Sequence, residues 1–157
     1  EDGDSCIIRN PRTPRYWYNY LWNENRYCAQ ISQIGHGRSY YLSEKAEMCM
    51  INRDNARYVY LRDEDSGVCW NIGEGPLNTE VEDYRCTHSI GYSEICSRKD
   101  DIEGSWRIFV PKEGYHEVWT LKLRNTGKEV RNLSVFSAVS FSLEDFPIRD
   151  ITRCTAA

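Results

Sequence analysis

The sequence lacks the features that mark several functional classes. No run of apolar residues approaches the length of a membrane span, and no charged-then-apolar leader opens the chain. Basic residues are not in excess, because 20 Lys and Arg stand against 24 Asp and Glu and give a net charge of −4. A nucleic-acid surface needs clustered Lys and Arg. We therefore expect neither a membrane span nor a nucleic-acid partner in a chain whose 157 residues suffice for one domain.

The cysteines and histidines show no metal-ligand or redox spacing. The seven cysteines include no Cys-x-x-Cys pair, which excludes zinc-ribbon and thioredoxin-type motifs. The three histidines, His36, His88 and His116, are scattered along the chain. An odd, unclustered set of cysteines is typical of reduced thiols in a cytosolic protein. We therefore predict a cytoplasmic protein without a metal site.

Catalytic fingerprints are missing as well. The chain contains no Gly-x-Ser-x-Gly, P-loop or Rossmann motif, and spacing alone does not single out a carboxylate pair for glycoside chemistry. His88 has Tyr84, Arg85 and Tyr92 nearby in sequence and could belong to a polar site. A lone His between strands is more often a structural residue with its hydrogen bonds satisfied. We assign no catalytic residue.

Aromatic side chains, in contrast, are abundant, with 11 Tyr and 5 Trp. Residues 16–22 alone carry five aromatics, which is more than one face of a strand can bury. Some of these rings must therefore contact another layer, a partner or a ligand. Tyr and Trp suit strands and half-exposed surfaces, and they also suit the faces of sugars. Packing and sugar binding are both open at this point.

Period-two patterns predict an all-β fold made of two packed antiparallel sheets. Residues 27–33 and 39–42 form one expected hairpin, and residues 119–124 and 133–143 form another with one buried face. Residues 84–97 are interpreted as one long strand, which would place Cys86 and Cys96 about 33 Å apart and unable to bond. Residues 44–50 are the one short stretch of helix-friendly composition, and residues 52–55 are expected to turn.

Residues 57–70 combine more aromatics, charges and turn residues than any other stretch. A strand-like run leads into Asp63, Glu64, Asp65, Ser66 and Gly67, and Trp70 follows. A calcium loop needs oxygen ligands at alternating positions around a Gly, which this cluster does not provide. Asp and Ser also cap turns through local hydrogen bonds. We therefore expect a strand that feeds an acidic turn.

Several blocks of the chain, taken in order, are similar to a known family. They are Asn19-Tyr20-Leu21, the run Arg57-Tyr58-Val59-Tyr60-Leu61-Arg62-Asp63-x-Asp65-Ser66 with Trp70, Cys86-x-His88-x-x-Gly91-Tyr92, Glu117-Val118-Trp119-x-Leu121-Lys122-Leu123, and Leu133-Ser134-Val135. Together they resemble the N-terminal β-sandwich domain of the inverting carbohydrate phosphorylases of glycoside hydrolase family 94, formerly glycosyltransferase family 36, whose type member is cellobiose phosphorylase. The order holds over residues 9–143.

This resemblance implies a galactose mutarotase-like supersandwich over residues 1–146, followed by an exit segment over residues 147–157. It implies a cytosolic parent enzyme that cleaves a β-glucoside with inorganic phosphate, inverts the anomeric centre and needs no metal or organic cofactor. The catalytic Asp and the phosphate site of the family belong to a following (α/α)6 barrel, so we expect no activity from this chain alone. In the family the sandwich supports a homodimer and lends loops to the acceptor side of the active site.

The resemblance also suggests roles for individual residues. Arg62, Asp63, Asp65 and Ser66 would form a structural motif that fixes a turn, with Arg62 as the partner of the acids. Residues 142–150 head toward the acceptor side and depart from the Asn-rich version of cellobiose phosphorylase, which leaves the acceptor open. The candidate carbohydrate-binding residues are Trp17, Trp22, Tyr40, Trp70, Asp145 and Arg149.

Two alternatives stay open beside the phosphorylase domain. The first is a free-standing carbohydrate-binding or assembly module, in which aromatic platforms with polar neighbours hold an oligosaccharide. The second is a purely structural β-domain without a ligand.

Overall fold

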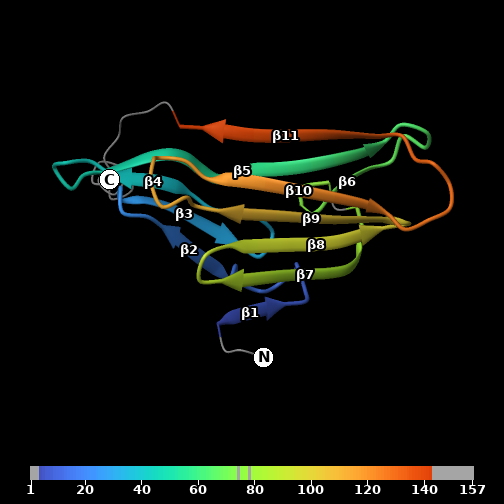
Figure 1. Cartoon of the computed structure of the whole chain (residues 1–157), viewed down its shortest axis with the longest axis horizontal. Coiled ribbons are helices and arrows are strands. Elements are labelled where there is room, and N and C mark those ends of the chain that lie inside the picture. The colour runs from blue at the N-terminus through green and yellow to red at the C-terminus, as the bar shows by residue number, and fades with distance from the viewer. Residues whose placement is uncertain (1–3, 74, 78, 143–157) are drawn as a thin grey trace, which may run out of the picture.

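The computed structural model describes residues 4–73, 75–77 and 79–142, and for residues 53–56 the backbone alone. All regular elements within these residues are strands (Figure 1). The strands are β1 Ser5–Ile8, β2 Tyr18–Trp22, β3 Tyr27–Ser32, β4 Ser39–Leu42, β5 Met48–Asp63, β6 Cys69–Asn71, β7 Glu82–Ser89, β8 Ser93–Lys99, β9 Ile102–Phe109, β10 Val118–Asn125 and β11 Leu133–Phe141.

The strands form two antiparallel sheets, which confirms the predicted sandwich. A five-stranded sheet has the order β1-β7-β8-β9-β10, and a six-stranded sheet has the order β11-β5-β4-β3-β2 with β6 paired to β5. Residues of β7, β8 and β9 alternate between buried and more exposed, which shows that one face of their sheet covers the core between the two sheets. Both sheets contribute to it, for example Leu61 and Ile31 from one and Trp106 and Ile95 from the other.

The stretch 57–70 forms the strand and turn that the sequence predicts. Strand β5 ends at Asp63, a tight turn follows, and β6 returns beside β5 with Leu61 opposite Trp70. Gly67 has a φ of 73° in this turn, a conformation that glycine adopts without a steric penalty. The acidic cluster therefore sits at the tip of a hairpin.

The prediction of one strand over residues 84–97 is wrong. The chain turns at residues 90–92, and β7 pairs with β8 so that Cys86 lies opposite Ile95 and Arg85 opposite Cys96. Cys86 is buried in the core, whereas Cys96 lies on the outer face. Because the chain turns near Gly91, the two thiols are not separated along one long strand. They lie on opposite faces of the sheet that β7 and β8 form.

Residues 44–55 also differ from expectation. Residues 44–50 form no helix, since residues 43–47 make a turn and β5 begins at Met48. The polar residues 52–55 continue β5 instead of turning. Cross-strand hydrogen bonds to β4 and β11 override the turn preference of this stretch.

The predicted hairpin of residues 119–124 and 133–143 does not form. Strand β10 pairs with β9 at the edge of one sheet, and β11 pairs with β5 at the edge of the other. The connecting residues 126–132 therefore cross between the sheets. The face of β11 expected to be buried is largely open, with exposed fractions of 47% for Val135, 41% for Val139 and 65% for Phe141.

The expected exit segment over residues 147–157 lies outside the described residues, as do Leu143 and the candidate sugar-binding residues Asp145 and Arg149. Among the described residues, no helix is long and apolar enough to cross a membrane.

Candidate functional site

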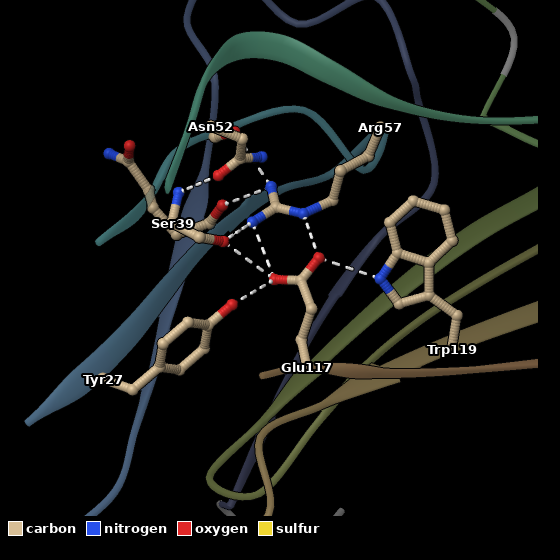
Figure 2. A network of polar contacts seen from close by, with 8 residues as sticks. Tyr27, Ser39, Asn52, Arg57, Glu117 and Trp119 are labelled. Atoms are coloured by element: carbon tan, nitrogen blue, oxygen red, sulfur yellow. Dashed lines mark hydrogen bonds and ion pairs between the residues drawn. The ribbon is translucent and has the colours of Figure 1, made fainter. Parts of the chain in front are cut away.

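A buried arginine fastens the two sheets together. Arg57 of β5 points into the sandwich and is fully shielded from solvent. Its Nη1 donates to the carbonyl oxygens of Gln30 at 3.1 Å and Gly37 at 2.9 Å, and its Nη2 donates to Ser39 Oγ. Its Nε lies 2.5 Å from Oε1 of Glu117, which comes from the other sheet just before β10 (Figure 2). A guanidinium can be buried only when its charge and its donors are satisfied in this way.

Glu117 is saturated by the same cluster, which we call the interlayer clasp (Tyr27, Ser39, Arg57, Glu117 and Trp119). Its Oε1 also accepts from Trp119 Nε1 at 2.8 Å, and its Oε2 accepts from Ser39 Oγ at 2.9 Å, Tyr27 Oη at 3.2 Å and Arg57 Nη2 at 2.9 Å. Burial acts to raise the pKa of Glu117, but the Arg57 charge and the donated hydrogen bonds outweigh it, so the pKa is lowered. The carboxylate is therefore ionised and occupied, which suits a scaffold and not a general acid.

Gly37 is needed for the clasp to close. Its φ of 131° lies in the region that L side chains rarely adopt, and a Cβ at this position would lie 2.0 Å from the Gln30 carbonyl oxygen. This close approach places the carbonyl oxygens of Gln30 and Gly37 next to each other, so both accept hydrogen bonds from Arg57 Nη1.

Further polar side chains connect the sheets near β2. Asn19 Nδ2 donates to Ser89 O at 2.7 Å, and Asn23 Nδ2 donates to Gly114 O at 2.8 Å. The ring nitrogens of His88 lie 2.9 Å from Ser93 Oγ and 3.0 Å from the Trp17 carbonyl oxygen. Burial lowers the pKa of His88. His88 is thus a structural residue with satisfied hydrogen bonds, as the sequence allowed.

Two acids at the end of β5 and in the following turn, Asp63 and Asp65, hold the loop 126–132 that crosses between the sheets. Asp63 Oδ1 accepts from the backbone N–H of Asp65 at 2.9 Å and of Ser66 at 3.3 Å, and Asp63 Oδ2 pairs with Arg131. The hydrogen bond from Arg131, with those backbone donors, lowers the pKa of Asp63 to about 2. Asp65 accepts from Asn132 Nδ2 at 3.0 Å.

The partner assigned to these acids from the sequence was wrong. Arg62 points outward and lies 3.6 Å from Glu64 in an exposed pair. Successive residues of a strand face opposite sides, so Arg62 cannot reach Asp63 across the sheet, and Arg131 takes that place.

The outer side of the six-stranded sheet carries a continuous row of rings. Tyr20, Tyr18, Tyr16, His36, Tyr58 and Tyr60 contact one another in that order, with centroid separations of 6.5, 5.9, 6.2, 5.2 and 5.6 Å. Phe136 of β11 lies opposite Tyr60 in register and is 52% exposed. We call this surface, with Trp22, the aromatic face. Exposed apolar patches of this kind mark contact sites.

The structure separates the aromatic residues proposed from the sequence for sugar binding. Trp22 is 75% exposed and lies in one row with Cys28 and Tyr40, so its ring and that of Tyr40 share the aromatic face. Trp17 is exposed just before β2. The prediction that Trp70 binds sugar does not fit the structure, because Trp70 is buried in the core opposite Leu61 and offers no surface platform. A strand pattern does not reveal which of its two faces is covered by another sheet.

An open cavity of about 320 Å³ adjoins the clasp between the edges β10 and β11. Its apolar lining comes from Tyr115, Trp119, Val139 and Phe141, and Glu117 also lines it. Among the described residues, no three His, Cys, Asp or Glu side chains are placed to hold a metal ion. Sequence reasoning did not find the clasp, since Arg57 and Glu117 are 60 residues apart and neither pattern nor spacing links them.

Comparison with known proteins gives a consistent family. The profile described as "Glycosyl hydrolase 94, supersandwich domain" matches residues 4–154. A 3-O-beta-D-glucopyranosyl-beta-D-glucuronide phosphorylase of Paenibacillus borealis is 43% identical over 91% of this chain and 18% of its own length. A solabiose phosphorylase of the same organism is 32% identical over 93% of the chain and 20% of its own length.

An N,N'-diacetylchitobiose phosphorylase of Vibrio proteolyticus is 35% identical over 90% of the chain and 18% of its own length. The chain thus spans about a fifth of the length of the curated relatives it matches. With the profile match over residues 4–154 and the two-sheet fold, the chain belongs to the glycosyl hydrolase 94 supersandwich family.

Proposed function

We propose that this chain is the non-catalytic supersandwich part of a cytoplasmic, inverting glycoside phosphorylase. The observation that carries the proposal is the match of nearly the whole chain to about a fifth of several disaccharide phosphorylases. The reduced thiols of Cys6, Cys28, Cys49, Cys69, Cys86 and Cys96 support the cytoplasmic location. The parent enzyme would cleave a β-linked glucoside with inorganic phosphate.

The interior of the sandwich supports a scaffold role. Glu117 is a buried carboxylate, and its two oxygens already accept from Arg57, Trp119, Ser39 and Tyr27. A catalytic acid must reach the reacting bond with a transferable proton. The clasp offers no such group, which supports the proposal that the chemistry belongs to another part of the parent enzyme.

The aromatic face provides a surface for contact with that other part. Tyr20 is 54% exposed, Trp22 75% and Phe136 52%, all on one side of the six-stranded sheet. Aromatic side chains are enriched in the cores of protein interfaces. We propose that this face packs on the catalytic domain or on the partner subunit, and that the sandwich thereby supports dimerisation and the acceptor side of the active site.

A second candidate is a free-standing carbohydrate-binding module. The row Trp22–Cys28–Tyr40 favours it, because Trp22 and Tyr40 flank a small thiol side chain and could receive a sugar ring. The same rings would then contact an oligosaccharide instead of a protein.

A chimera and a titration separate the two candidates. This chain replaces the matching segment of the Paenibacillus borealis glucuronide phosphorylase, and sugar 1-phosphate formation is measured from that relative's disaccharide and phosphate. The proposal expects an active chimera, an inactive isolated chain, and no saturable heat when the isolated chain is titrated with cellobiose or laminaribiose. Saturable binding with an inactive chimera would instead support the module.

A further inference from the structure

Two adjoining hollows form one groove on the outer side of the five-stranded sheet, opposite the aromatic face. The first has a volume of about 530 Å³ and the second about 260 Å³, and they share Ser105 and Lys122 as a common wall. The groove exists because the short side chains of Cys96 and Ser105 lie in register between the long side chains of Arg85 and Lys122. The middle of this row is therefore low and its two ends are high.

The first hollow gathers positive charge in a protein whose net charge is −4. Arg9, Arg85, Arg98, Lys122 and Arg124 line it with only two carboxylates, Asp83 and Glu103. Arg98 is occupied by Asp83 at 2.8 Å and Glu82 at 2.6 Å, and Arg124 lies 3.8 Å from Glu103.

Three cations of this hollow are not neutralised. Within the described residues, Arg9, Arg85 and Lys122 have no carboxylate at ion-pair distance. Glu94 lines the second hollow, but its carboxylate is already engaged, since it lies 3.4 Å from Arg107 and accepts from Ser105 Oγ at 2.8 Å. These three cations are therefore available to an anion from solution.

The second hollow adds surfaces that suit a ring. Phe109 and Tyr92 line it, and Arg107 lies 4.3 Å above the Tyr92 ring, which holds both side chains in place. Thr120 adds a hydroxyl at the far wall. An inorganic anion would use only the first hollow, whereas a sugar acid would use both.

We propose that this groove is a binding site for a carboxylate-bearing sugar, a uronate. The carboxylate would lie between Arg85 and Lys122, where arginine recognises it through paired hydrogen bonds. The pyranose ring would extend past Ser105 toward Phe109 and Thr120. The volume of the first hollow falls in the range of small-ligand sites. The site is separate from the aromatic face and goes beyond the proposed function, since neither candidate function assigns it.

The test is a titration of the whole chain, followed by amide chemical shifts, with D-glucuronate as the probe and D-glucose, acetate and inorganic phosphate as comparisons. We expect saturable shifts at Ser105, Lys122 and Arg85 with glucuronate, and an affinity about tenfold above that of glucose or acetate. Because the attraction is electrostatic and at the surface, the affinity should fall as the salt concentration rises.

Variants locate the site. Arg85→Gln and Lys122→Gln should each weaken glucuronate binding about tenfold while leaving the melting temperature unchanged. Lys112→Gln is the matched control, because Lys112 lies in an exposed pair with Glu24 outside the groove and should bind as the unaltered chain does.

Three results would overturn the proposal: no saturation with glucuronate, equal binding of glucose, or binding of acetate or phosphate as tight as that of glucuronate. Phosphorolysis is not measured in this test, so its failure is distinguishable from failure of the phosphorylase assignment.

Discussion

At the scale of single residues, the molecule depends on one ion pair that water scarcely reaches. The Arg57 side chain is fully buried and the Glu117 side chain is 13% exposed. Such a pair gains little over an apolar pair of the same size, but loss of one partner leaves the other charge buried without compensation. We therefore expect the clasp to fix the register in which the two sheets pack more than to add net stability.

Replacing Glu117→Gln should expose this asymmetry. We expect a loss of about 3 kcal/mol in the free energy of unfolding, because the Arg57 charge stays buried without its counterion. Urea unfolding measures it, with Glu24→Gln in an exposed pair as the control that changes it by less than about 0.5 kcal/mol. The double variant Arg57→Met, Glu117→Leu should recover part of the loss. An unchanged midpoint in Glu117→Gln would contradict the role of the clasp.

Acid should act through Asp63 in a defined window. Its pKa in the folded chain is about 2 because Arg131 and two backbone N–H groups hold the ionised form. A depressed folded pKa contributes stability that is complete above the unfolded pKa of about 4 and is lost as the pH falls toward 2.

The melting temperature should therefore drop between these pH values, and Asp63→Asn should reduce the size of that drop. Glu24→Gln, changed in an exposed pair, should keep the slope of the unaltered chain. A slope in Asp63→Asn equal to that of the unaltered chain would exclude Asp63 as a source of the acid sensitivity.

At the scale of elements, the edge strand β11 links the fold to the proposed function. Phe136→Ser removes a half-exposed ring from the aromatic face, so the melting temperature of the isolated chain should shift by no more than about 3 °C. In the chimera with the relative's remaining chain, the same change should lower phosphorolysis. It should also shift the chimera from dimer toward monomer on size-exclusion chromatography. Val130→Ser is a matched control, since Val130 is 86% exposed and lies in the connection before β11, outside the strands of the aromatic face. If both variants lose phosphorolysis and dimer to the same extent, the aromatic face is not the contact surface.

The elements also show why the sequence predicts strands better than their partners. Alternation in residues 119–124 and 133–143 identifies both strands, yet β10 pairs with β9 and β11 with β5. A period of two reports which residues share a face, but hydrogen-bond partners depend on which edges are free in the folded sheets. For the same reason the strand pattern does not show that Trp70 is buried, and it does not link Arg57 to Glu117. The turn at residues 63–67 was predictable because its signal is local.

At the scale of the whole molecule, the two outer faces have opposite character. One side presents Tyr20, Trp22 and Phe136, and the other presents the groove with Arg85 and Lys122. Under the two proposals above, the sandwich would contact a protein surface on one side and a charged ligand on the other. Because both sheets contribute to one core, we expect them to unfold together.

Trp106 tests that expectation. It is fully buried, its ring lies 5.2 Å from that of Trp119, and a Cβ on Gly35 of the opposite layer would lie 2.4 Å from its ring. Trp106→Ala should therefore destabilise the chain by about 3–5 kcal/mol, whereas Trp22→Ala on the exposed face should change stability by less than about 0.5 kcal/mol. Because both sheets share this contact, the unfolding curves from tryptophan fluorescence and far-ultraviolet circular dichroism should coincide in the unaltered chain. Two separate transitions would mean that the two sheets unfold independently and would contradict this expectation.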